Sequence, residues 1–247
     1  AVSFSSTDYI GHQYGPMSVE IEDTYLRLDK EIETLLNFIE KELGEEFLFF
    51  LTSDHGAVNV PQYLIDNNLS GGYFNQEQLT LNLGNYLEEQ FKVNEIIANV
   101  SNYQVFFNHK TIQQNNLKLE NVEQAVITLL LNQKGVSEAV AATTFKTTVS
   151  GKILGNAQRG YHQERSGDVL YILKSGWIPA GYTTGTTHGS PYNYDTHVPL
   201  LWYGSGVKKG ESDALSTIPD IAATIATLLQ IEKPSACTGN PIVEVTK

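Results

Sequence analysis

The first quarter of the chain places a helical repeat of apolar positions between two short apolar runs. From Ser18 to Leu43 apolar residues recur every three or four positions, and Gly44 follows as a helix stop. Residues 1–7 (AVSFSST) read as a buried strand, and the continuous apolar run 47–52 (FLFFLT) is typical of a strand covered on both faces. The order strand, helix, strand predicts a βαβ unit.

The pattern changes from about residue 60 to residue 148. Asn and Gln become more frequent, and the apolar runs become short and mixed. The segment predicts one helix and three strands, in the order strand 79–83, strand 103–107, helix 120–132 and strand 137–144. Together these elements indicate a small α+β lobe.

Buried-strand character returns in the last third of the chain, at 168–174 (DVLYILK) and 197–204 (HVPLLWYG). Thr217 is a candidate cap for a final helix that runs to about Leu229, with Pro219 in its first turn. This part therefore continues the strand and helix pattern of the first quarter.

The fold class that follows is α/β, with a parallel-dominated sheet flanked by helices. Segments 1–59 and 149–247 are expected to form this α/β domain, and 60–148 is expected to be an inserted, smaller α+β lobe. A chain of 247 residues with 41% apolar residues is large enough for one sizeable core with such an insertion.

Charge and composition exclude several classes of partner. A formal net charge of −12 opposes binding to nucleic acid and to anionic membrane surfaces. No apolar run approaches the ~18 residues that a membrane span needs. The lone Cys237 excludes an internal disulfide. There is no initiator Met and no signal sequence, so we expect the chain to start inside a larger protein.

Three separated patches carry residues that bind metal ions, and each follows an apolar run. They are Asp8 with His12, Asp54 with His55, and His188. Asp and His supply the oxygen and nitrogen donors that suit zinc or a related divalent ion. Because ligands in an open α/β sheet gather at the carboxyl ends of strands, distant patches can form one site.

Each patch alone has an ordinary structural explanation. Asp8 and His12 fit a helix cap and a surface histidine, although a spacing of four places both on one face of a helical turn. Asp54 and His55 fit a turn after a strand, and His188 fits a hydrogen-bonded loop residue. The occurrence of all three patches in one chain favours a hydrolytic metal centre.

Four longer motifs surround these residues: 7–16 (TDYIGHQYGP), 51–57 (LTSDHGA), 165–173 (RSGDVLYIL) and 186–204 (TTHGSPYNYDTHVPLLWYG). In these motifs the sequence resembles the alkaline phosphatase superfamily, in particular the PafA-like alkaline phosphatases and the type I phosphodiesterase/nucleotide pyrophosphatases. The resemblance implies an alkaline-phosphatase-like fold, dependence on zinc and hydrolysis of phosphate esters.

The resemblance also implies a division of the metal ligands between two Zn²⁺ ions in a complete active site. By motif, Asp8, His12 and His188 hold one ion, while Asp54 and His55 help to hold the other. The family's Thr or Ser nucleophile, one further aspartate ligand and the groups that contact phosphate belong to an N-terminal half that precedes these motifs. We therefore expect that half to be absent, no catalytic nucleophile to lie within this chain, and the isolated chain to be inactive.

Two further residues, Asp195 and His197, are candidates for orienting His188 from behind the metal ligands, or equally for a structural loop role. The threonines near His188 are less suited to act as nucleophiles, because their density beside glycines is explained by a loop that needs small hydrogen-bonding residues. These threonines are Thr183, Thr184, Thr186 and Thr187.

Three functions remain open. The first is an alkaline phosphatase acting on phosphate monoesters, and the second is a phosphodiesterase or nucleotide pyrophosphatase with the same metal core. The third is an isolated, inactive zinc-binding fragment. The expected partners are small phosphate esters, and either a second copy of the chain or the missing N-terminal half. The resemblance places the protein in the periplasm or outside the cell.

Overall fold

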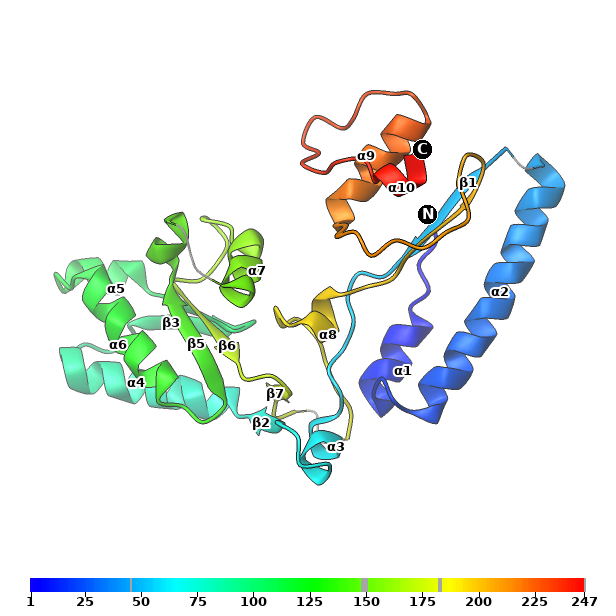
Figure 1. Cartoon of the computed structure of the whole chain (residues 1–247). Coiled ribbons are helices and arrows are strands. Elements are labelled where there is room, and N and C mark those ends of the chain that lie inside the picture. Colours follow the sequence, from blue (N-terminus) through cyan, green and yellow to red (C-terminus); the bar gives the residue numbers. More distant parts are fainter. Residues whose placement is uncertain (45, 148–150, 182–183, 247) are drawn as a thin grey trace. The chain divides into compact units, whose positions relative to one another are not determined.

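The computed structural model describes residues 1–44, 46–147, 151–181 and 184–246, and Figure 1 shows its elements. The helices are α1 (Ser6–Tyr14), α2 (Val19–Leu43), α3 (Pro61–Asp66), α4 (Gln76–Phe91), α5 (His109–Gln114), α6 (Leu119–Leu131), the 3-10 helix η1 (Ala142–Lys146), α7 (Lys152–Gly160), α8 (Asn193–Thr196), α9 (Ile218–Leu228) and α10 (Val243–Thr246). The strands are β1 (Leu48–Thr52), β2 (Gly72–Phe74), β3 (Ile97–Ser101), β4 (Gln104–Phe107), β5 (Val136–Ala141), β6 (Val169–Leu173), β7 (Trp177–Pro179) and β8 (Leu200–Gly204).

The chain is of the mixed α/β class and forms two compact units. The first unit comprises Ala1–Tyr25 and His55–His197, and the second comprises Leu26–Asp54 and Val198–Lys247. These boundaries are drawn differently from the predicted domain and inserted lobe, which remain a prediction. No helix among the described residues is both long enough and apolar enough to cross a lipid bilayer.

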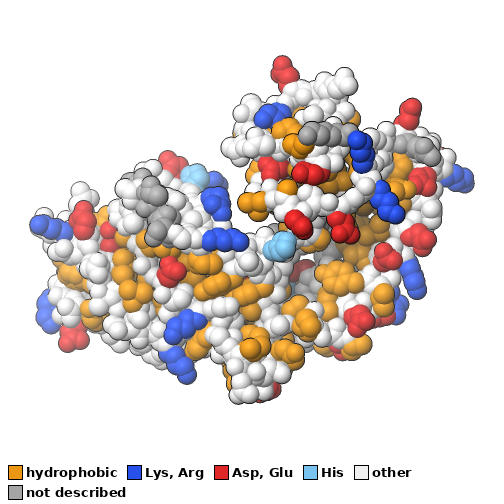
Figure 2. Space-filling model, in the orientation of Figure 1, with side chains coloured by type: hydrophobic (Ala, Val, Ile, Leu, Met, Phe, Trp, Pro, Cys, Tyr) orange, Lys and Arg blue, Asp and Glu red, His pale blue; other side chains and the backbone are white. Residues whose placement is uncertain are grey.

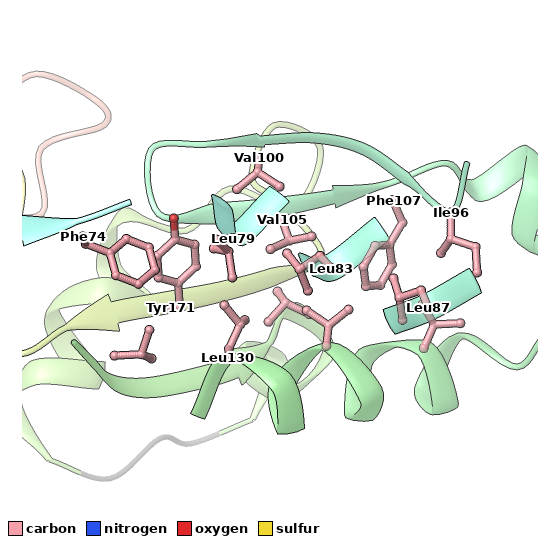
Figure 3. Close-up of a cluster of buried hydrophobic side chains, with 14 of the residues drawn as sticks. Phe74, Leu79, Leu83, Leu87, Ile96, Val100, Val105, Phe107, Leu130 and Tyr171 are labelled. Carbon is pink, nitrogen blue, oxygen red and sulfur yellow. The ribbon is translucent and has the colours of Figure 1, made fainter. Parts of the chain in front are cut away.

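The main core of the first unit lies between a four-stranded antiparallel sheet and two helices. The strand order is β3-β4-β6-β5, and α4 and α6 pack against the sheet (Figure 1). Figure 3 shows the apolar side chains that fill this core, among them Phe74, Leu79, Leu83, Leu87, Ile96, Val100, Val105, Phe107, Leu130 and Tyr171. Burial of this continuous apolar cluster stabilises the sheet and the helices together.

Most of the elements predicted for this region are confirmed. The helix 120–132 is α6, and the strands 103–107 and 137–144 are β4 and β5. The strand predicted at 168–174 is β6, and it pairs with both β4 and β5. The latter part of the chain thus contributes a central strand to the sheet of the predicted lobe.

The predicted strand 79–83 is wrong, because these residues lie inside helix α4. Leu79, Leu83 and Leu87 are at most 1% exposed, whereas Leu81 is 63% exposed. The run Leu79, Leu81, Leu83 reads as the alternation of a strand, but the spacing of four between the buried leucines is that of one helix face. The side chain of Asn75 caps this helix by accepting the amide of Gln78.

The opening of the chain also differs from its prediction. Residues 1–4 lie outside helices and strands, and α1 begins at Ser6, so the strand predicted at 1–7 is wrong and the βαβ unit is not formed. Three of these four residues are exposed, and an apolar segment becomes a strand only where another strand pairs with it. Among the described strands the parallel pair is β2 with β7.

The second unit contains the strand pair β1–β8 and helix α9, together with most of α2. The strands predicted at 47–52 and 197–204 are confirmed, and they pair antiparallel from Leu48↔Gly204 to Thr52↔Leu200. The predicted helix 18–43 is confirmed as α2, and Gly44 follows it at φ +69°, a backbone conformation that glycine adopts readily.

Helix α9 begins and ends close to the predicted residues. The N-cap Thr217 and Asp220 form a capping box, in which the Asp220 carboxylate accepts the Thr217 amide at 2.6 Å. Asp220 also accepts the amide of Asn240 at 2.8 Å. The start of α9 is therefore fixed by local hydrogen bonds that the sequence signals directly.

Helix α4 yields a test of this core. Leu83→Ala should lower the free energy of unfolding by about 2–5 kcal/mol, because it leaves a cavity in a well-packed interior. Leu81→Ala removes the same atoms from an exposed position of the same helix and should change stability little. Urea unfolding followed by circular dichroism measures both. Equal losses in the two variants would contradict the orientation of α4.

Candidate metal centre

Helix α1 presents Asp8 and His12 on one face. The two residues are four positions apart, and Asp8 Oδ1 lies 3.4 Å from His12 Nε2. Asp8 stands in the first turn and His12 in the last turn of the helix, which is the arrangement that the helix dipole favours. The helix ends at its C-cap Gly15, three residues after His12, where a φ of +90° turns the chain away from the helix axis.

Two histidines from distant segments meet this face. The distance from Asp8 Oδ1 to Nε2 is 3.8 Å for His55 and 4.0 Å for His188. The rings of His55 and His188 are stacked with their centroids 3.4 Å apart, and the His12 ring lies 5.1 Å from that of His188. Ligand atoms of Asp8, His55 and His188 all lie within 4.8 Å of one another.

The set of Asp8, His55 and His188 fits a divalent metal ion, and His12 adds a donor beside Asp8. Bonds of about 2.0–2.2 Å in a tetrahedral site place neighbouring ligand atoms roughly 3.5 Å apart. The distances from Asp8 Oδ1 to the three imidazole nitrogens, 3.4, 3.8 and 4.0 Å, lie close to this value. The three histidine side chains are 24–30% exposed, so an ion can reach the cluster from solvent.

Hydrogen bonds orient two of the imidazole rings. His12 Nδ1 lies 2.8 Å from the carbonyl oxygen of Thr186, and His55 Nδ1 lies 3.0 Å from that of Gly56. A carbonyl accepts only the protonated nitrogen, so each contact selects the tautomer with a proton on Nδ1 and a free electron pair on Nε2. Both Nε2 atoms therefore face Asp8 ready to bind an ion.

Thr186 connects the segments that carry these side chains. It is fully buried; its amide donates to His12 O at 3.0 Å, and its hydroxyl donates to Val58 O at 2.6 Å. A Cβ at the preceding Gly185 would lie 2.0 Å from His12 O, so only glycine permits this approach. The sequence interpretation of these threonines as loop residues did not identify this connecting role.

The remaining threonines of this loop do not change the interpretation of the loop as structural. Thr184 and Thr187 flank the Thr186 connection, and Thr183 lies outside the described residues. The Thr186 hydroxyl is occupied by Val58 O and is inaccessible to solvent, so it is not available as a nucleophile. The signal for its role was the Gly-Thr-Thr-His sequence itself, in which a glycine directly precedes the threonines.

Asp195 and His197 lie in different environments. Asp195 is 4% exposed; its Oδ2 accepts the amide of Ser190 at 2.7 Å, and its carbonyl accepts the amide of Gly56 at 2.8 Å. His197 is exposed and follows helix α8. The proposed influence of both residues on His188 remains a prediction.

Asp54 ends the first segment of the second unit, Leu26–Asp54, and directly precedes His55 in the chain. It is exposed, and the Ser53 hydroxyl lies 3.5 Å from its Oδ1. The five predicted ligands thus have different outcomes. Asp8, His12, His55 and His188 converge within the first unit, whereas the assignment of Asp54 to a metal remains a prediction.

The surroundings of His188 favour its neutral imidazole form. Burial lowers the pKa of His188, and the neighbouring His55 and His12 lower it further, against the opposing effect of Asp8 and Asp195. Burial raises the pKa of Asp195, although hydrogen bonds from Ser190 oppose this shift. Because a metal ion binds neutral imidazole, the lowered pKa of His188 keeps it competent to bind at lower pH than an ordinary histidine.

The chain belongs to the type I phosphodiesterase / nucleotide pyrophosphatase family, whose model matches residues 1–197. It is 37% identical over 246 residues to alkaline phosphatase PafA of Elizabethkingia meningoseptica, a match covering 99% of this chain and 45% of PafA. It is 40% identical over 253 residues to alkaline phosphatase PhoV of Synechococcus elongatus, covering 100% of this chain and 44% of PhoV.

The fold is also that of a solved alkaline phosphatase. The crystal structure of PafA matches with a TM-score of 0.91 at 36% identity, covering 98% of this chain and 46% of that chain. The resemblance inferred from the four motifs is thereby confirmed. The chain spans somewhat less than half the length of the relatives it matches.

Metal binding by this cluster can be measured directly. The chain should bind Co²⁺ or Zn²⁺ at neutral pH and release it as the pH falls and the histidines protonate. His188→Ala should weaken binding strongly, because it removes one of the converging donors. His109→Ala is the matched control, since His109 is 61% exposed and pairs with Asp168 in another part of the unit. Isothermal titration calorimetry that finds equal affinities for both variants would contradict the site.

Proposed function

We propose that this chain supplies the metal centre of a zinc-dependent phosphate-ester hydrolase, an alkaline phosphatase that acts on phosphate monoesters. The observation that carries the proposal is the convergence of three histidine Nε2 atoms within 4.0 Å of one Asp8 oxygen. Imidazole and carboxylate donors suit zinc. Membership of the family and likeness to two alkaline phosphatases support the reaction class.

A complete active site would hold two zinc ions, one on Asp8, His12 and His188, and the other on Asp54, His55 and ligands from outside this chain. The ions would act as Lewis acids that neutralise phosphate charge and stabilise the leaving oxygen. Burial lowers the pKa of His188, which favours its neutral form, and carbonyl hydrogen bonds orient His12 and His55. The phosphoryl-accepting Thr or Ser would also lie outside this chain.

The charge of the chain agrees with capture of phosphate by metal rather than by a basic surface. The formal net charge is −12, and on the face drawn in Figure 2 the Lys and Arg side chains stand singly or in small groups among acidic ones. A bound dication would supply the positive charge that an anionic substrate needs. The proposed substrates are therefore small phosphate esters, and nucleic acid is not among the proposed partners.

A second candidate is a phosphodiesterase or nucleotide pyrophosphatase. The family model that covers residues 1–197 carries this description, and it supports the diester reaction on the same metal core. We favour the monoester reaction because both relatives described above are alkaline phosphatases. On the same likeness we place the protein in the periplasm or outside the cell.

Catalysis tests the proposal in the gene product that carries this chain. It should hydrolyse 4-nitrophenyl phosphate at alkaline pH, faster than bis(4-nitrophenyl) phosphate, and a chelator should abolish the activity. His188→Ala should lower kcat/KM roughly a thousandfold or more, since the metal contributes several kcal/mol. His109→Ala should leave it unchanged. The 247-residue chain alone should show little turnover with zinc added.

Three results would contradict these expectations. Activity that survives exhaustive chelation would remove the metal from the mechanism. A preference for the diester would favour the second candidate. Zinc-dependent turnover by the 247-residue chain would place the nucleophile within it, and would show that the isolated chain is more than a zinc-binding fragment.

A further inference from the structure

Asp195 holds a buried carboxylate of which only one oxygen has a partner. Oδ2 accepts the amide of Ser190, whereas Oδ1 is buried and has no hydrogen-bond partner among the described residues. An unpaired charged oxygen in a protein interior costs at least ~1–3 kcal/mol. Such an atom calls for an explanation, and a missing hydrogen-bond donor is the simplest one.

The same residue links the two segments that carry the stacked histidines. Ser190 lies two residues after His188, and Gly56, whose amide donates to the Asp195 carbonyl, directly follows His55. A Cβ at Gly56 would lie 2.2 Å from the carbonyl oxygen of Tyr194, so the two segments are in close backbone contact. Asp195 is therefore hydrogen-bonded to the backbone of both segments that carry the stacked rings.

One ring of the cluster lacks the orienting bond that the others have. The Nδ1 atoms of His12 and His55 each face a carbonyl oxygen, but within the described parts of the chain no hydrogen bond is made by His188 Nδ1. Its Nε2 faces Asp8. The Asp195 carboxylate is held at Ser190, two residues after His188 in the chain, by the hydrogen bond that its Oδ2 accepts from the Ser190 amide.

We propose that Asp195 is a positioning residue of the metal centre, whose free Oδ1 accepts the Nδ1–H of His188 when Nε2 binds the metal. A histidine that binds a metal through one nitrogen commonly donates its other N–H to a carboxylate, which fixes the ring and makes it a stronger ligand. This inference rests on the proposed function, because it requires the metal centre. It assigns the orienting role to Asp195 and not to the exposed His197.

Asp195→Asn is the informative change. An asparagine has one acceptor oxygen and one donor nitrogen, so it accepts the Ser190 amide or the imidazole N–H, but not both. The affinity of the chain for Co²⁺ should fall 10–100-fold, as is typical when an outer partner of a ligand is lost. Asp168→Asn is the matched control: Asp168 Oδ2 also accepts a backbone amide at 2.7 Å, from Phe107, and should not affect Co²⁺ affinity.

A second measurement follows the His188 proton itself. In the zinc-loaded chain labelled with ¹⁵N, the His188 Nδ1–H proton should resonate downfield and exchange slowly with water, and Asp195→Asn should remove this signal. A purely structural role of Asp195 would leave the signal in place. Equal Co²⁺ affinity of Asp195→Asn and the unchanged chain, or fast exchange of the His188 proton in the zinc-loaded chain, would overturn the role of Asp195 and leave the metal centre intact.

Failure of the proposed function gives a different result. In that case the unchanged chain and His188→Ala would bind Co²⁺ equally weakly, and the inference about Asp195 would fail with it. Thermal unfolding of each metal-free variant shows whether the fold is retained. Support for the role of Asp195, failure of that role alone, and failure of the metal centre are distinguishable, because the metal affinity of the unchanged chain is measured first.

Discussion

The candidate metal centre depends on the reciprocal hydrogen bonds between His12 and Thr186. Thr186 N donates to His12 O, and His12 Nδ1 contacts Thr186 O, across a sequence separation of 174 residues. The Thr186 hydroxyl adds a third bond to Val58 O, across 128 residues. The Thr186 hydroxyl bond is buried, so breaking it would leave a polar group without a partner and away from water. They convert two distant loops and one short helix into a single rigid support for Asp8, His12, His55 and His188.

Three imidazoles around one carboxylate form an arrangement with a clear electrostatic requirement. If two rings were protonated at a centroid separation of 3.4 Å, as between His55 and His188, their charges would repel strongly in a partly buried site. The rings are therefore stable together when they are neutral or when they surround a cation. A metal ion meets both conditions, because it is a cation and it binds neutral imidazole. Because the His55 and His188 rings lie so close together, the residues of this chain alone do not form two distinct sets of ligands for two ions. His55, expected beside Asp54, stacks on His188, and ligands from elsewhere would decide the division.

The sequence predicted best those features that depend on neighbouring residues. The start of α9 follows from Thr217 and Asp220, three residues apart, and the end of α2 from Gly44. The candidate ligands could be selected from the sequence because each motif is short and carries its chemistry within a few positions. The strand wrongly predicted at 79–83 shows the limit: a leucine at every second position fits a strand and a helix equally, and the packing against the sheet decides. The orphan Oδ1 of Asp195 has no sequence signal at all, because its environment is made of segments 139 residues apart (Gly56 and Asp195).

The strands β1 and β8 show the same dependence on distant parts. Both were predicted as strands covered on both faces, yet in the second unit Phe50 is 37%, Tyr203 46% and Leu201 57% exposed. A pair of strands by itself is marginally stable in water, and its open edges attract further strands. The chain spans about 45% of the length of PafA, which matches it over 99% of its residues. These exposed apolar side chains agree with the expectation, drawn from the sequence, that further polypeptide or a second copy of the chain associates with this part of the protein.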